Sequence, residues 1–150
     1  MRVVIQRARN ASVSVAEEII GEIDHGVVIL LGIEEADTQE DIDWLVRKIT
    51  NMRIFDDENG VMNRSLIEAD GNALVISQFT LHASTKKGNR PSYIKAARPE
   101  QAEPMYQTFA AQLAGVINKP AQTGKFGADM QVSLVNDGPV TILLDTKNKE

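Results

Sequence analysis

The sequence has no cysteine, only two histidines and a single tryptophan. Without cysteine the chain has neither a disulfide nor a thiol nucleophile, which is typical of a cytoplasmic protein. Its longest apolar run, residues 27–31, is far shorter than the ~20 residues that a membrane helix needs. The chain also opens on an alternating pattern and shows no charged and apolar leader. We therefore expect a cytoplasmic protein with no membrane span and no signal peptide.

Several motifs of common enzymes are also missing. Neither His25 nor His82 has another histidine, a cysteine or a carboxylate at a metal-ligand spacing, which disfavours a metal-dependent hydrolase. No Gly-x-Ser-x-Gly elbow, Walker loop or dinucleotide fingerprint occurs, and the glycines at 124 and 127 are too close together to cradle a phosphate. We therefore predict no metal and no nucleotide cofactor.

Charge is unevenly distributed along the chain. The net charge of −5 disfavours indiscriminate binding to nucleic acid, whose phosphates are bound mainly by lysine and arginine. Residues 82–98 nevertheless contain no acidic side chain, whereas residues 34–43 are rich in them. The basic side chains of the first segment are Lys86, Lys87, Arg90, Lys95 and Arg98. This segment either steers an anionic substrate or is an ordinary solvated loop.

Hydrophobic periodicity predicts one domain, residues 1–150, of the α+β class. Strands are expected at residues 2–8, 12–15, 18–23, 27–33, 73–81, 130–135 and 140–144. Turns are expected at residues 24–26, 56–60, 70–72 and 136–139. We place the strand at 27–33 in the middle of the sheet, because it is continuously apolar.

Two helices complete the pattern. One begins after Thr38, which has capping-box spacing to Asp41. Pro99 and Pro104 mark helix starts for the second, which ends before Pro120. Its apolar face is expected to contain Met105, Phe109, Leu113 and Val116. The whole predicts a mostly antiparallel sheet or partly closed β-barrel covered by two helices.

The apolar segment 75–81 contains three polar residues, Ser77, Gln78 and Thr80. Burying them costs free energy unless each finds a partner, so the segment is a candidate site. In an ideal strand Thr80 and His82 share a face, which suggests a hydroxyl nucleophile and an imidazole base. Against this, such side chains are rooted ~6.5–7 Å apart and no nearby carboxylate orients the ring. Alternatively, Ser77 and Thr80 simply satisfy backbone groups where the strand ends.

A second polar segment, Asn136 to Pro139, predicts a turn between two strands. Asp137 and Gly138 supply the positive φ, and Pro139 stops the hydrogen-bond ladder. The alternative is a cis peptide bond before Pro139, which would point the flanking carbonyls the same way and form a rigid polar wall.

These two segments resemble those of the D-aminoacyl-tRNA deacylases, and the resemblance runs nearly end to end. The similar segments are residues 1–7, 31–33, 51–55, 77–81, 90–92, 123–130 and 136–141. The resemblance implies hydrolysis of the ester that joins a D-amino acid, or glycine, to the 3′-terminal adenosine of tRNA. It also implies a homodimer with two active sites at the subunit interface. Each site would combine Ser77–Thr80 of one chain with Gly138–Pro139 of the other.

The same resemblance implies roles for individual residues. Ser77, Gln78 and Phe79 would line the ester and the adenosine, with Thr80 completing the catalytic segment. Gly138 and Pro139 would form a Gly-cis-Pro wall that contacts the α-amino group and leaves no room for an L side chain. Arg7 would hold this wall in orientation. The matching segments add further substrate-binding residues, namely Asn136, Met130 and Phe126.

The mechanism and the class of function each have an alternative. Thr80 as nucleophile requires a base that the sequence does not supply. We favour backbone N–H donors around residues 77–79 as an oxyanion hole, with the ribose 2′-OH of the substrate activating water.

The alternative class of function is a non-enzymatic dimeric RNA-binding module that uses residues 86–98. His82, Asn89 and Arg98 depart from the family pattern, and we expect them to affect tRNA contacts rather than the ester pocket.

Overall fold

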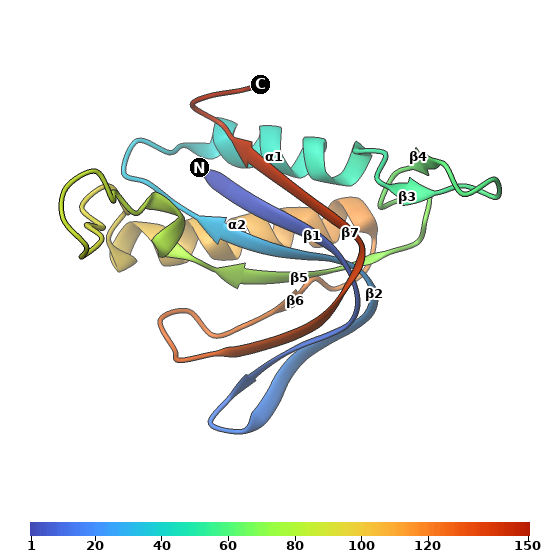
Figure 1. The fold of residues 1–150 in the computed structure, drawn as a ribbon, viewed down its shortest axis with the longest axis horizontal. Helices are drawn as coiled ribbons and strands as arrows, with labels where there is room; N and C mark the ends of the chain where they lie inside the picture. Colours follow the sequence, from blue (N-terminus) through green and yellow to red (C-terminus); the bar gives the residue numbers. More distant parts are fainter.

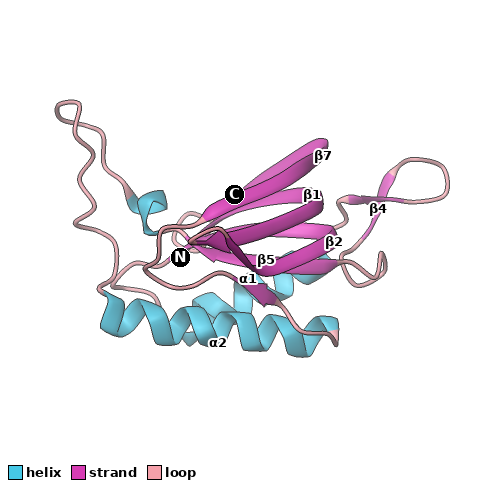
Figure 2. Cartoon of the chain, turned by 90° about the horizontal axis from the view of Figure 1, so that it is seen from below, coloured by secondary structure: helices cyan, strands magenta, loops and turns pink.

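The computed structural model describes all residues, 1–150, and combines a five-stranded sheet with two long helices (Figure 1). The elements are β1 (Arg2–Val15), β2 (Glu18–Gly32), α1 (Gln39–Asn51), β3 (Phe55–Asp56), β4 (Met62–Arg64), β5 (Asn72–Ser77), the 3₁₀ helix η1 (Phe79–His82), α2 (Pro99–Ile117), β6 (Gln122–Thr123) and β7 (Gln131–Asp145). Both helices lie on one face of the sheet (Figure 2). The predicted α+β class with two covering helices is confirmed.

The sheet has the order β6-β5-β2-β1-β7 and is mixed. The long pairs β1–β2 and β1–β7 are antiparallel, whereas the shorter pairs β2–β5 and β5–β6 are parallel. Parallel strands need a long crossover connection, and α1 with the β3–β4 hairpin supplies it between β2 and β5. The predicted central strand is confirmed, because residues 27–32 form the end of β2, the middle strand of the sheet, and only Ile33 lies beyond it.

The main core lies between the sheet and the helices. Alternating residues of β1, Val3 and Ile5, pack with Leu45 of α1 and with Phe109 and Leu113 of α2. A smaller cluster includes Val13, Ile23, Leu74 and Ile76. Neither helix combines the length and apolarity that a membrane-spanning helix requires.

Helix α1 begins as predicted. Thr38 is its N-cap, and its backbone N–H donates to Asp41 Oδ2 at 2.8 Å. In α2 the second predicted start is wrong, because the helix runs from Pro99 through Pro104. Val116 is also wrongly placed, since it is 44% exposed at the edge of the buried stripe.

The predicted turn at residues 24–26 is wrong, because β2 continues through it. The short strands predicted on either side of it therefore merge, as do those at 2–8 and 12–15. Gly26 has φ +142°, and a Cβ there would lie 1.9 Å from the carbonyl oxygen of Asn72. The glycine thus marks a close approach of β2 to β5 rather than a reversal of the chain.

Candidate active site

The first polar segment lies where β5 ends. The strand stops at Ser77, and Phe79–His82 form η1, so the predicted strand 73–81 is too long. The backbone N–H of Gln78 still donates to the carbonyl of Leu31 at 2.7 Å, but the chain then turns away. The prediction that Thr80 and His82 share one face of a strand is therefore wrong, because both residues belong to η1. At any helical N-terminus the first N–H groups, here those of Phe79 and Thr80, have no carbonyl within the turn.

Two cavities meet at this point. The larger, about 370 Å³, is lined mostly by apolar side chains, among them Leu31, Tyr93 and Phe126, with Arg98 as its charged group. The smaller, about 240 Å³, is lined by Met130, Val132 and neighbouring residues. Three predicted site residues, Ser77, Gln78 and Phe79, line both cavities. The Phe79 ring is 55% exposed and meets Tyr93 edge to face, with centroids 5.1 Å apart.

Thr80 and His82 do not form a catalytic pair. Thr80 Oγ1 accepts a hydrogen bond from Gln78 Nε2 at 2.5 Å, and Thr80 lines neither cavity. His82 is buried, and its Nε2 has no hydrogen-bond partner. The hydroxyl therefore has no imidazole base beside it.

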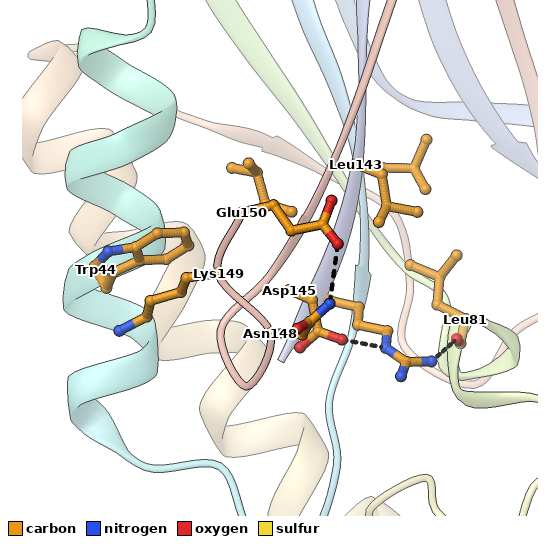
Figure 3. Close-up of a pocket in the computed structure, with 10 residues that line it drawn as sticks. Trp44, Leu81, Leu143, Asp145, Asn148, Lys149 and Glu150 are labelled. Atoms are coloured by element: carbon orange, nitrogen blue, oxygen red, sulfur yellow. Dashed lines mark hydrogen bonds and ion pairs between the residues drawn. The ribbon is translucent and has the colours of Figure 1, made fainter.

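Neighbouring elements hold the end of β5 in place. The Tyr106 hydroxyl of α2 donates to the carbonyl of Val75 at 2.7 Å, and burial raises the pKa of Tyr106 to about 12. In η1, which follows β5, the carbonyl of Leu81 accepts a hydrogen bond from Arg2 Nη1 at 3.1 Å, and Arg2 Nε also donates to Asp145 Oδ2 at 2.8 Å (Figure 3). This second contact lies beside a cavity of about 250 Å³ near the C-terminus, which contains none of the predicted site residues.

The second polar segment is a bulge in the middle of β7. The predicted turn at residues 136–139 is wrong, because β7 runs unbroken from Gln131 to Asp145. Gln6 of β1 pairs with Thr141 and Ala8 pairs with Asn136, so residues 137–140 stand opposite Arg7 alone. The Gly138–Pro139 peptide bond is cis, and Gly138 has φ +134°. The segment thus leaves the ladder without reversing the chain.

Arg7 binds this bulge from the core side of the sheet. Its side chain is almost fully buried, and its Nε donates to the carbonyl of Asp137 at 2.9 Å. Its Nη1 donates to the carbonyl of Ile54 at 2.8 Å and to Asp56 Oδ1 at 3.1 Å. The guanidinium therefore ties the bulge to the segment that leads into β3.

The predicted site residues thus fall into two groups. Ser77, Gln78, Phe79, Met130 and Phe126 gather around the two cavities, and Thr80 follows Phe79 in η1 without lining either. Gly138, Pro139, Arg7 and Asn136, at the β7 bulge, line neither cavity. Sequence reasoning missed Tyr93 and Leu31 as lining residues. Tyr93 directly follows the family-like segment 90–92, and this aromatic among basic residues was the available signal.

Strand register separates the two groups within one chain. Arg7, opposite the bulge, pairs with Val27, which pairs with Ala73, whereas Ser77 lies four residues further along β5. The bulge and Ser77 also lie three strands apart in the order β5-β2-β1-β7. Strand rise and spacing place them roughly 20 Å apart across the sheet.

The titratable side chains offer no metal cluster, since no group of three or more His, Cys, Asp or Glu residues is suitably arranged. Cationic side chains are instead prominent on an extended loop. Backbone bonds of 2.8 and 2.9 Å between Ser84 and Ser92 close its base, and Lys86, Lys87 and Arg90 are exposed beyond them.

Comparison with known proteins identifies close relatives. Residues 4–145 match the family model described as D-Tyr-tRNA(Tyr) deacylase. D-aminoacyl-tRNA deacylases of Bacteroides fragilis (strain YCH46) and Flavobacterium johnsoniae are 64% and 61% identical over 150 residues, covering 100% of both chains in each pair. A solved structure named c-Myc DNA Unwinding Element Binding Protein is 44% identical with a TM-score of 0.91, covering 97% of this chain and 99% of that one. A probable eukaryotic D-amino acid tRNA deacylase, 16% identical, shares the fold with a TM-score of 0.80 over 95% of this chain and 97% of that one.

Proposed function

The chain belongs to the D-Tyr-tRNA(Tyr) deacylase family, and we propose that its two cavities at the end of β5 receive the 3′ end of D-aminoacyl-tRNA. It is a hydrolase that releases the D-amino acid from tRNA. The observation that carries the placement is that Ser77, Gln78 and Phe79 line both cavities, so one substrate can occupy both while its ester lies against these residues.

The larger cavity takes the terminal adenosine. Its walls include the aromatic rings of Tyr93 and Phe126, on which a base stacks favourably. The smaller cavity, with Met130, takes the ester and the α-carbon of the amino acid.

Hydrolysis proceeds by attack of water on the ester carbonyl. The developing oxyanion is stabilised by backbone N–H groups around residues 77–79, chiefly that of Phe79, which lines both cavities and at the start of η1 has no carbonyl partner within the turn. The ribose 2′-OH of the substrate activates the water, and the 3′ oxygen leaves with a proton. The absence of an imidazole beside Thr80 supports this route over a Thr80 nucleophile.

The complete site requires two copies of the chain, because one chain keeps Ser77 and Gly138 roughly 20 Å apart. A homodimer brings the exposed Gly138 and Pro139 of one protomer to the cavities of its partner. The sheet face away from the helices supports this assembly. Leu30, Val4 and Leu143 pair in register there, and Leu143 is 67% exposed.

Gly138 and Pro139 then distinguish D- from L-aminoacyl substrates by excluding the L side chain. Their backbone faces the α-amino group and the α-carbon, so an L side chain meets the wall while a D side chain points away. Glycine has no side chain to exclude, so glycyl-tRNA is also a substrate.

The basic loop between Ser84 and Ser92 contacts tRNA phosphates. Lys86, Lys87 and Arg90 are exposed on it, and the same segment continues into Tyr93 and Arg98 at the larger cavity. Such contacts orient the acceptor end without reading sequence. We place the reaction in the cytoplasm, where aminoacyl-tRNA is made and used.

The test is release of amino acid from D-Tyr-tRNA and L-Tyr-tRNA by the purified protein, with a chelator present. Release from the D ester alone supports the proposal. Retained tRNA binding without release from either ester would instead identify a non-enzymatic RNA-binding module.

Dimerisation is tested separately by sedimentation. Leu143→Asp should yield monomers that have lost deacylase activity, because a charge in an apolar interface is costly. Val116→Asp is the matched control, since Val116 is exposed on α2 in the other layer. A fully active Leu143→Asp monomer would contradict the shared site.

A further inference from the structure

The bulge in β7 is held on both faces of the sheet by successive residues of β1. Arg7 holds it on the core side, and the side chain of Gln6 lies on the opposite face because strand side chains alternate. Gln6 Oε1 accepts a hydrogen bond from Thr141 Oγ1 at 2.6 Å and another from Asn136 Nδ2 at 3.3 Å. One carboxamide oxygen therefore joins the two residues that flank the bulge.

We propose that Gln6 is a positioning residue that sets the geometry of Gly138–Pro139. This inference rests on the proposed function, in which Gly138 and Pro139 exclude L side chains. Gln6 acts through the bulge and does not touch the substrate. Asn136, expected from the sequence to bind substrate, supports the wall in the same way through its bond to Gln6.

The bulge needs this second support because the ladder provides none inside it. Residues 137–140 face a single residue of β1, so the regular pairs stop at Asn136 and resume at Thr141. Arg7 contacts the bulge only at Asp137, through its carbonyl at 2.9 Å and its carboxylate at 3.6 Å, on one face. Without Gln6 the two ends of the bulge are free to separate on the other face, which shifts the wall relative to the substrate.

The test compares Gln6→Leu, which removes the acceptor, with Gln6→Glu, which keeps an oxygen that accepts both bonds. Loss of two hydrogen bonds should lower kcat/KM for D-Tyr-tRNA about tenfold in Gln6→Leu and raise the share of L-Tyr-tRNA hydrolysed. Gln6→Glu should stay within about threefold of the wild type. Equal losses in both variants, or an unchanged D/L ratio in Gln6→Leu, would contradict the positioning role.

A second pair of variants tests the hydrogen bond between Thr141 and Gln6 by changing its donor, Thr141 of β7. Thr141→Val removes the hydroxyl with little change of shape, and Thr141→Ser retains it. Thr141→Val should lower activity and D/L selectivity as Gln6→Leu does, and the two changes combined should cost less than the product of their separate effects. Fully independent effects would contradict a shared bond.

Gly138→Ala separates failure of this inference from failure of the proposed function. If Gly138→Ala impairs deacylation while Gln6→Leu and Thr141→Val do not, Gly138–Pro139 acts without help from Gln6, and the inference alone is wrong. If Gly138→Ala also leaves activity and selectivity unchanged, the proposed wall itself is wrong.

Discussion

At the end of β5 and in the bulge of β7 the backbone leaves regular strand pairing, yet the two regions are held by different means. At β5 the strand simply stops, and Phe79, the first residue of η1, lines two cavities with a backbone N–H that has no carbonyl partner within the turn. In β7 the strand continues on both sides of the bulge, where Arg7 bonds Asp137 within it and Gln6 bonds the two residues that flank it. In the proposed mechanism the first region contacts the substrate through its backbone, whereas the shape of the second depends on side chains and on one glycine. Substitutions should therefore be tolerated at Thr80 in η1 and be costly in the bulge.

The largest effect is expected for Gly138→Ala. Gly138 has φ +134°, and a Cβ there would lie 2.9 Å from Val140 Cγ2 and 3.1 Å from Arg7 Nη2. Because an L residue is strained at this φ, the bulge must rearrange, and deacylation of D-Tyr-tRNA should fall about a hundredfold. Single-turnover rates measure the loss.

Gly115→Ala is the matched control, since its helical position in α2 has open space around the added Cβ. It should retain activity and gain up to about 1 kcal/mol of unfolding free energy. Equal activity of both glycine variants would remove the contrast between the two regions.

Arg7→Gln should have the next largest effect. It removes a buried guanidinium that donates to the Asp137 and Ile54 carbonyls and to Asp56. We expect a loss of about 3 kcal/mol in unfolding free energy and at least a tenfold fall in activity, because one buried and two partly buried acceptors lose their donor. Urea denaturation and deacylation assays measure the two effects.

Arg9 provides the comparison, because it pairs with the same Asp137 at 3.2 Å but is 64% exposed. Arg9→Gln should cost less than about 1 kcal/mol. A stability loss in Arg9→Gln as large as that in Arg7→Gln would show that net charge, and not the hydrogen bonds of the buried Arg7 guanidinium, stabilises the bulge.

A smaller effect is expected at the basic loop that leads to the β5 cavities. The double variant Lys86→Gln and Lys87→Gln should raise KM severalfold with little change in kcat. It should also reduce the slope of log(kcat/KM) against log[salt] by about 1 to 2, because fewer counterions are released from tRNA. Arg47→Gln with Lys48→Gln, an equal charge change on the exposed side of α1, should leave both quantities unchanged. An unaltered salt slope in the loop variant would exclude phosphate contacts by these lysines.

Local sequence predicted the parts of the molecule that local chemistry determines. Thr38 and Asp41 begin α1 as their capping spacing indicates, and residues 27–33 are central because they are continuously apolar. The sequence also singled out both polar segments, residues 77–80 because polar side chains follow an apolar run and residues 136–139 because their composition is typical of a turn. The role of the second segment came only from the family resemblance.

The features that local sequence did not predict depend mostly on pairing between strands that are far apart in the sequence. Residues 136–139 have the composition of a turn, and only their pairing partners in β1 keep both sides of β7 in one strand. Likewise Gly26 looks like a turn glycine, but it is required by the approach of Asn72 from β5. The length of β5 was misjudged because Phe79 and Leu81 continue the apolar alternation after the strand has ended.

The smallest effect is expected for Thr80→Ala at the end of β5. The Thr80 hydroxyl accepts from Gln78 Nε2 and lines neither cavity, whereas its backbone N–H belongs to the start of η1 and survives the substitution. Deacylation of D-Tyr-tRNA should therefore fall less than about tenfold, the scale of one side-chain hydrogen bond. Thr80→Ser should match the wild type. A fall of about 10³-fold or more in Thr80→Ala, rescued in Thr80→Ser, is the signature of a covalent nucleophile. That result would make the end of β5 depend on a side chain, as the bulge does, and would overturn the contrast between the two regions.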